Sequence, residues 1–103
     1  MTSDSPQLTT QTLKVLRALL ENPRDELSGA QIRNSTKLHT GTLYPILLRL
    51  ERAGWLESRW EVEDPKSLGR PRRRYYRVTA LGAKQARAGF QDIKAVVGGL
   101  SWV

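Results

Sequence analysis

The basic side chains of one short segment have the clearest chemical potential in this sequence. Residues 66–77 contain six basic residues and no acidic one, whereas the rest of the 103-residue chain contains eleven basic and ten acidic residues. The net charge of +7 therefore lies almost entirely in this segment. Cationic groups at such density repel one another unless an anion or nearby carboxylates neutralise them. The segment predicts a polyanionic partner such as nucleic acid.

Catalytic and metal-binding groups are scarce by comparison. The sequence has no cysteine and one histidine, so it lacks a thiol nucleophile, a thiolate metal site and the histidine pairs typical of zinc centres. Its adjacent carboxylates, at 25–26 and 63–64, lie in polar turns, and it has no glycine-rich phosphate loop. We therefore expect no enzymatic activity, no catalytic residue, no metal site and no cofactor.

Periodic apolar residues predict the elements that position the basic segment. The expected elements are helices at about 9–20, 28–34 and 40–53, strands at 55–60 and 73–78 joined by a long irregular loop, and a last helix from residue 80. Gly54 is placed to end the third helix. Three helices followed by a hairpin predict a mainly α, α+β fold, the winged helix-turn-helix, in which the third helix enters the major groove. An ordinary helical pair is the alternative, and the basic hairpin loop favours the winged fold.

Two regions of this fold would contact DNA. Thr40, Thr42 and Tyr44 lie in the first turn of the third helix, where hydroxyls can bond bases or phosphates and a threonine methyl can touch thymine. The basic loop would lie over the sugar-phosphate backbone or enter the minor groove, unless its own acidic residues at 61, 63 and 64 neutralise it. The expected DNA contacts are Ser28, Lys37, His39, Thr40, Thr42, Tyr44, Arg49, Lys66, Arg70, Arg72 and Arg73.

The last helix shows a heptad pattern. Small or apolar residues recur at 83, 86, 90, 93, 97 and 100, a 3-4-3-4-3 spacing that predicts a helix-helix seam between two copies of the chain. The seam residues expected in a dimer interface are Ala86, Phe90, Ile93, Val97 and Leu100. The expected organisation is a flexible arm at 1–7, a DNA-binding domain at 8–79 with its wing at about 56–78, and a dimerisation helix and tail at 80–103.

Three motifs in the expected order resemble a known family. They are GTLYP at 41–45, LERAGWL at 50–56 and GRPRRRYYRVT at 69–79, followed by LG at 81–82. Over roughly residues 13–100 the sequence is similar to the PadR family of bacterial transcriptional regulators, in the short form with one C-terminal helix. The resemblance implies a winged helix-turn-helix that binds operator DNA as a homodimer, usually to repress. It also implies that part of the first helix, represented by Leu13, joins the dimer interface.

The resemblance also raises the question of a small-molecule effector. In multidrug-sensing members of the family, a tryptophan three positions after a phenylalanine lines a flat-ligand pocket between the subunits. Here Phe90 is followed at that spacing by Ile93, so this stacking partner is missing. Trp102 could supply an aromatic ring to an effector pocket with Phe90 and Ile93, or it could pack on the partner subunit, which we favour.

We therefore expect a sequence-specific regulator that acts as a repressor from a palindromic operator in double-stranded DNA. A nucleic-acid-binding module without sequence preference, which would use the same basic loop, is the alternative. A protein-interaction adaptor that uses the fold without DNA is a third interpretation. No apolar run approaches the length that a bilayer span needs, and the first residues are polar and acidic, so we expect a soluble cytoplasmic protein with no membrane partner.

Overall fold

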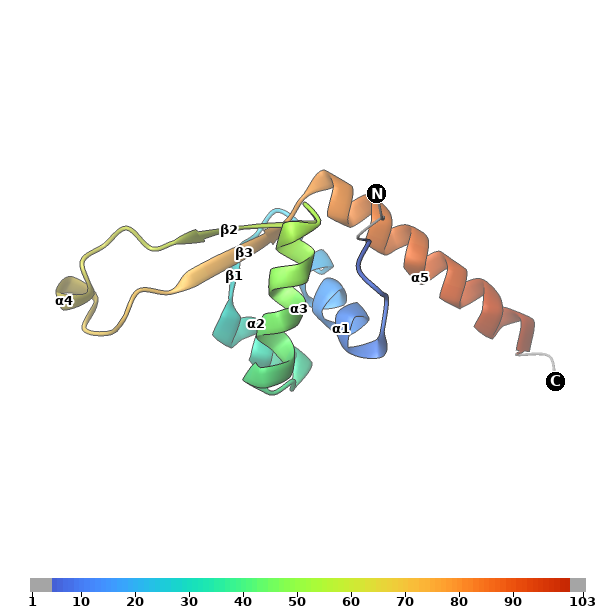
Figure 1. The fold of residues 1–103 in the computed structure, drawn as a ribbon, viewed down its shortest axis with the longest axis horizontal. Coiled ribbons are helices and arrows are strands. Elements are labelled where there is room, and N and C mark those ends of the chain that lie inside the picture. Colours follow the sequence, from blue (N-terminus) through green and yellow to red (C-terminus); the bar gives the residue numbers. More distant parts are fainter. Residues whose placement is uncertain (1–4, 101–103) are drawn as a thin grey trace.

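A computed structural model of the protein describes the backbone of residues 5–100 and the side chains of residues 5–99. The described residues form a mainly helical fold with a small antiparallel sheet (Figure 1). Its elements are α1 (Thr10–Leu20), β1 (Leu27–Ser28), α2 (Gly29–Thr36), α3 (Thr40–Arg52), β2 (Leu56–Trp60), α4 (Pro65–Leu68), β3 (Arg74–Val78) and α5 (Ala80–Leu100). The predicted fold class is confirmed. Among these residues, no helix combines the length and the apolar character that a bilayer crossing requires.

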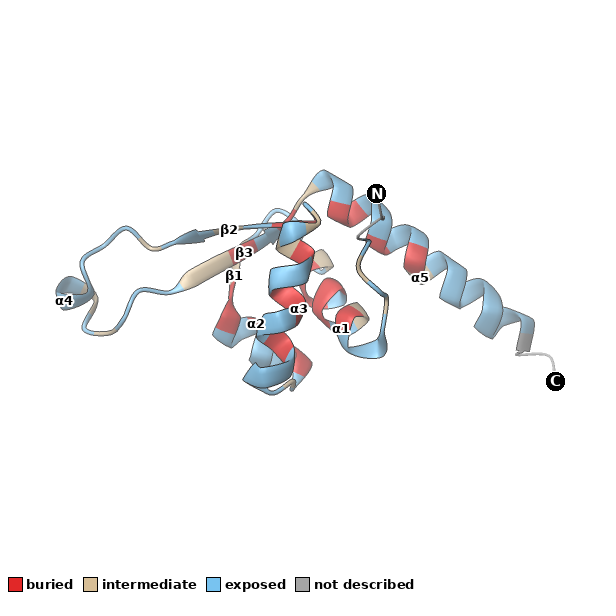
Figure 2. Cartoon of the chain, viewed as in Figure 1, coloured by how far each residue is buried: buried red, intermediate tan, exposed pale blue. Residues whose placement is uncertain are grey.

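The core lies between α1, α2, α3 and the inner face of the sheet. Each helix supplies apolar residues at helical spacing, and Figure 2 shows these buried positions along the facing sides of α1 and α3. The largest fully buried side chains are Val15, Leu16, Leu19, Ile32, Leu43, Leu47 and Leu50. Burial of this cluster fixes the rotation of α3 about its axis, and so determines which of its side chains remain exposed.

Local capping groups set the ends of the helices. The hydroxyl of Thr9 accepts a hydrogen bond from the main-chain N–H of Thr12 at 3.2 Å and caps α1. Ser28 and Gln31 form a reciprocal capping box at the start of α2. Gly54, with φ of +79°, follows α3 as predicted, in a conformation that glycine adopts without strain.

The sheet contains one strand more than the sequence predicts. β2 and β3 pair antiparallel with Leu56 opposite Val78, and the buried face of β3 holds Tyr76 and Val78 as expected. The two-residue strand β1 pairs with the other edge of β3, which gives the order β1-β3-β2. Two residues are too few to show an alternating pattern, so the sequence gives no periodic signal for β1.

The loop expected to be irregular between the two long strands contains the single helical turn α4. Asp64 caps this turn by accepting a hydrogen bond from the main-chain N–H of Lys66 at 3.0 Å, and Pro65 occupies the first helical position. Gly69 ends it with φ of +70°. An Asp-Pro start and a glycine end are recognisable helix signals, but a helix this short has no apolar stripe.

The heptad seam of α5 is divided between two environments. Ala83 and Ala86 are buried in the core of their own chain, whereas residues 91–99 are exposed (Figure 2). Close packing explains the small residues in the first half of α5, since a Cβ atom added at Gly82 would lie 2.1 Å from the main-chain oxygen of Trp55. The expected dimer contact at Ala86 is therefore wrong, because this side chain is fully buried within its own chain.

Candidate nucleic-acid interface

One long face of α3 is exposed. It lies opposite the buried side chains of Leu43, Ile46, Leu47 and Leu50, and three of the predicted contacts, Thr40, Thr42 and Arg49, are exposed on it or on its flanks. The complete set of exposed α3 residues is Thr40, Gly41, Thr42, Tyr44, Pro45, Leu48, Arg49 and Arg52. Sequence reasoning missed Leu48, whose side chain is 48% exposed. The available signal was that Leu48 does not belong to the buried repeat at 43, 46, 47 and 50.

Tyr44 joins the first half of α3 to the start of α2. A Cβ atom added at Gly29 would lie 2.5 Å from the hydroxyl oxygen of Tyr44, so the tyrosine ring occupies space that only glycine leaves open. The ring nevertheless stays 45% exposed. Tyr44 therefore has a fixed position at the surface, between the two helices of the helix-turn-helix.

The structure corrects the expected role of Ser28. Its side chain is 3% exposed and accepts a hydrogen bond from the main-chain N–H of Gln31 at 3.2 Å, so the hydroxyl cannot reach a phosphate. A groove of about 510 Å³ lies at this end of α2, and Tyr44, Arg72 and Arg73 are among the residues that line it. Ser28, Gly29 and Ala30, at the N-terminus of α2, also line this groove, and a helix N-terminus favours an anion.

Lys37 and His39 lie in the turn between α2 and α3. Lys37 adopts the left-handed conformation with φ of 63°, and its side chain is exposed. His39 precedes α3, and its carbonyl oxygen accepts a hydrogen bond from the N–H of Leu43 at 2.8 Å, but its side chain forms no capping bond. Both side chains are exposed beside the first turn of α3, where a contact with DNA stays a prediction.

Glu61 joins the two sides of the hairpin loop. Its carboxylate pairs with the guanidinium of Arg70 at 2.6 Å and accepts a hydrogen bond from the main-chain N–H of Arg73 at 2.8 Å. These two interactions lower the pKa of Glu61 to about 2. Arg70 was expected to contact DNA, but in this structure it holds the loop together.

Three further ion pairs involve arginines of the sheet: two connect it with its surroundings, and one joins β3 to β2. Arg59 pairs with Glu26 at 2.7 Å, Arg74 with Glu51 at 3.5 Å, and Arg77 with Glu57 at 2.5 Å. Arg59 also lies over the ring of Tyr75, and Arg74 over the ring of Trp60, at 5.2 and 5.1 Å from the ring centres. Ion pairs thus neutralise half of the basic segment: Arg70 and Arg77 pair within the hairpin, and Arg74 pairs with Glu51 of α3.

The other half of the basic segment forms what we call the wing-tip cluster, Lys66, Arg72 and Arg73. Within residues 5–100, none of these three side chains forms an ion pair with a carboxylate, and all three are exposed. Arg72 is oriented by a hydrogen bond from its Nε atom to the carbonyl oxygen of Glu63 at 2.9 Å. Among the described residues, the wing-tip cluster therefore holds three cations that no ion pair neutralises, in a loop that also contains the carboxylates of Glu63 and Asp64.

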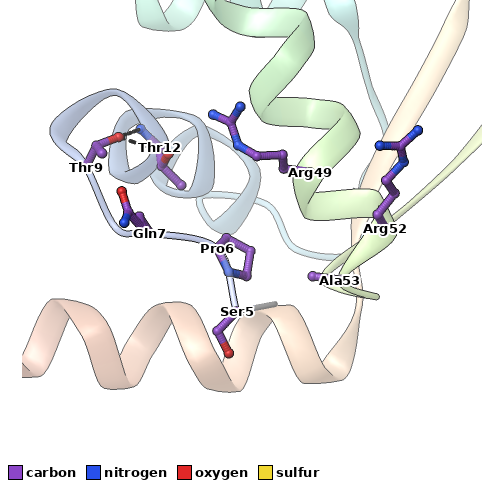
Figure 3. A pocket seen from close by; sticks show the side chains of 8 residues that line it. All are labelled: Ser5, Pro6, Gln7, Thr9, Thr12, Arg49, Arg52 and Ala53. Atoms are coloured by element: carbon purple, nitrogen blue, oxygen red, sulfur yellow. Dashed lines mark hydrogen bonds between the residues drawn. The ribbon is translucent and has the colours of Figure 1, made fainter. Parts of the chain in front are cut away.

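A second group of cations lies at the C-terminal end of α3. Arg49 and Arg52 border a hollow of about 780 Å³ between α3 and the segment from Ser5 to Thr12. Figure 3 shows their side chains extending from α3 with the two guanidinium groups well separated. Neither forms an ion pair within the described part of the chain, so both are free to contact an external anion.

The residues expected at a subunit interface lie in different environments. Leu13 on α1 is half-buried, and Phe90 packs partly against the core of its own chain. Ile93 and Val97 are 40% and 58% exposed. The side chain of Leu100 and the whole of Trp102 lie outside the described residues. Among residues 5–100, no three side chains of the metal-binding types gather closely enough to hold a metal ion.

Comparisons with known proteins identify the family. The family model described as the transcriptional regulator PadR-like family matches residues 25–88, which is more than half of the chain. No curated protein sequence matches significantly. A transcriptional regulator homologue from Pyrococcus horikoshii OT3 has a solved structure with a TM-score of 0.74 and 26% identity, over 90% of this chain and 85% of that one.

Two further solved structures are similar. A PadR family transcriptional regulator from Eggerthella lenta gives a TM-score of 0.69 and 26% identity, over 84% of this chain and 76% of that one. Bacillus subtilis PadR, solved in complex with operator DNA, gives a TM-score of 0.65 and 19% identity, over 80% of this chain and 48% of that one, a likeness that shows the fold alone. The exposed face of α3, the hairpin and the match over residues 25–88 together establish that this chain belongs to the PadR-like family of transcriptional regulators.

Proposed function

We propose that the protein is a sequence-specific repressor that binds a palindromic operator as a homodimer. The observation that carries this proposal is the wing-tip cluster, Lys66, Arg72 and Arg73, whose charge has no internal counterion among the described residues. Charge that folding leaves without an ion pair is available to phosphates. Arg72 and Arg73 of this cluster line a groove together with Tyr44 of α3. The solved complex of Bacillus subtilis PadR with operator DNA supports this use of the fold.

In this proposal the two regions have different roles. The first turn of α3, with Thr40, Thr42 and Tyr44, contacts base edges in the major groove. The wing-tip cluster binds the sugar-phosphate backbone or the adjacent minor groove. Lys37, His39 and Arg49, which are exposed around α3, contact phosphates and fix the position of the helix on the duplex.

The dimer is proposed from the second half of α5. Ile93, Val96 and Val97 are 40%, 67% and 58% exposed, and they lie on one side of a helix that extends away from the core (Figure 1). Two such helices that pack along this side would bury apolar surface that a single chain leaves in water. The dimer would present two copies of α3 about 34 Å apart, the spacing of successive major grooves, and so match a palindromic site.

Competition binding tests this proposal against a sequence-independent module. The chain is footprinted on the intergenic DNA upstream of its own gene, and affinity for the protected site is compared with affinity for bulk DNA of equal length. A regulator should prefer its site by roughly a thousandfold or more. Equal affinity for both DNAs would instead establish the sequence-independent alternative.

A conservative substitution tests the role of α3. Tyr44→Phe removes one hydroxyl but keeps the ring that packs over Gly29, and it should lower the preference for the specific site by about three- to tenfold. Tyr75→Phe makes the same change on β3 and is the matched control, which should keep the full preference.

A further inference from the structure

The middle of the exposed face of α3 is apolar. Tyr44, Pro45 and Leu48 are all exposed, and their spacings of three and four residues make them neighbours on the helix surface. Leu48 is 48% exposed and takes no part in the buried cluster. The start of α3, with Thr40, Thr42 and the hydroxyl of Tyr44, thus offers hydroxyl groups, whereas Pro45 and Leu48 offer only carbon and hydrogen at the surface.

The charges around this apolar surface are positive. Arg49 and Arg52 follow it along α3, and the groove beside Tyr44 is lined by Arg72 and Arg73. Glu51 is the acidic residue of α3, and its carboxylate accepts a hydrogen bond from the Ser58 hydroxyl at 2.6 Å and pairs with Arg74, so it is held toward the sheet. An apolar strip flanked by cations on two sides fits a partner whose outer surface is anionic and whose recessed surface contains apolar groups.

The major groove of DNA has this chemistry. Its edges are phosphates, and its floor contains one apolar feature, the 5-methyl group of thymine. The strip is continuous with the proposed DNA-contacting face, and Pro45 has no N–H to donate to a base. We propose that Leu48 contacts the methyl group of one thymine in each half-site, and so determines the base pair that this chain prefers there.

This inference rests on the proposed function, and the experiment first tests that function. Binding sites are selected with the wild-type chain from a pool of duplexes with a randomised segment. Each thymine of the selected site is then replaced by deoxyuridine, symmetrically in both half-sites, which removes the methyl group and leaves every hydrogen-bonding group in place. Affinity for each duplex is measured by fluorescence anisotropy.

The wild-type chain should lose affinity at one thymine position, by about fourfold for each half-site, the factor that corresponds to one buried methyl group. Leu48→Ala should bind the thymine and deoxyuridine duplexes equally well. Leu48→Met keeps an apolar side chain of similar length and should retain most of the discrimination. Because Leu48 is half-exposed, both variants should unfold at nearly the wild-type temperature.

The matched control is Leu81→Ala, the same truncation at a leucine that is 46% exposed in the first turn of α5. This variant should discriminate thymine from deoxyuridine as the wild-type chain does. Discrimination that persists in Leu48→Ala would overturn the inference, because another residue would then contact the methyl group. A selected site at which no thymine matters would overturn it as well. A pool that yields no enriched sequence would refute the proposed function, and the Leu48 contact with it.

Discussion

The clearest test of the interface is the salt dependence of DNA binding when unpaired arginines are removed. The wing-tip cluster has three cations in each subunit without a carboxylate partner among the described residues, and therefore six in a dimer. If each neutralises one phosphate, the wing contributes about −5 to the slope of log affinity against log salt. The double variant Arg72→Gln/Arg73→Gln removes four of these contacts and should make the slope shallower by about 3 to 4.

The structure supplies a control with the same change in net charge. Arg59→Gln/Arg77→Gln also removes two arginines, but these pair with Glu26 and Glu57 in the folded chain. Their guanidinium groups already have counterions, so the slope should change by less than about one. Affinity for the selected duplex is measured by fluorescence anisotropy between about 50 and 200 mM KCl. An equal change of slope in both variants would show that net charge controls binding, and would refute the division into paired and unpaired arginines.

Other substitutions test the exposed face of α5, its close packing and the pairing in the wing. Ile93→Glu/Val97→Glu places charge on the proposed interface and should give monomers in analytical ultracentrifugation. Gly82→Ala should lower the free energy of unfolding by about 2 kcal/mol in urea titrations, because overpacking costs about 3 kcal/mol and alanine recovers about 1 kcal/mol of helix propensity. The carboxyl of Glu61 should titrate in NMR with a pKa of about 2, below its ordinary pKa of 4.5. The stabilisation from its pairing with Arg70 is therefore complete above pH 4.5 and is lost as the pH falls through about 2.

Each of these outcomes has a control. Val62→Glu places charge on an apolar wing residue that is 82% exposed, and this control variant should remain a dimer. If the variant with both α5 substitutions also remained a dimer, the interface would lie elsewhere. Gly99→Ala in the same helix adds a methyl group that meets none of the described residues within 4 Å, so a Gly82→Ala variant as stable as Gly99→Ala would contradict the close approach of α5. A Glu61 carboxyl that titrates near 4.5 would show that the wing pair does not form in solution.

Local patterns in the sequence were sufficient to predict the helix-turn-helix. The repeat of Leu43, Ile46, Leu47 and Leu50 specifies which face of α3 is buried, and Gly54 specifies where the helix ends. Alternation likewise identifies the buried face of β3. These features depend on neighbours a few residues apart, which is the range over which periodicity and capping act.

Features that depend on distant partners could not be predicted in this way. Arg74 lies 23 residues from Glu51 along the chain, and Arg59 lies 33 residues from Glu26, so the sequence does not indicate which arginines are paired. The same limit explains the error at Ala86. Small residues at heptad spacing fit a dimer seam and close packing against the chain's own core equally well, and only the tertiary structure distinguishes the two.

The carboxylates of the hairpin have a role that a count of net charge conceals. Between residues 56 and 78 there are seven basic and four acidic residues, and an acidic residue facing DNA would ordinarily weaken binding. Here Glu57 and Glu61 pair with arginines of the hairpin itself, so they remove repulsion that would otherwise drive its two sides apart. The cations that remain unpaired, Lys66, Arg72 and Arg73, lie on a loop whose shape Glu61 fixes. A hairpin with fewer acidic residues would have more charge but a less defined position for it, and an interface that must match the spacing of phosphates depends on position as well as on charge.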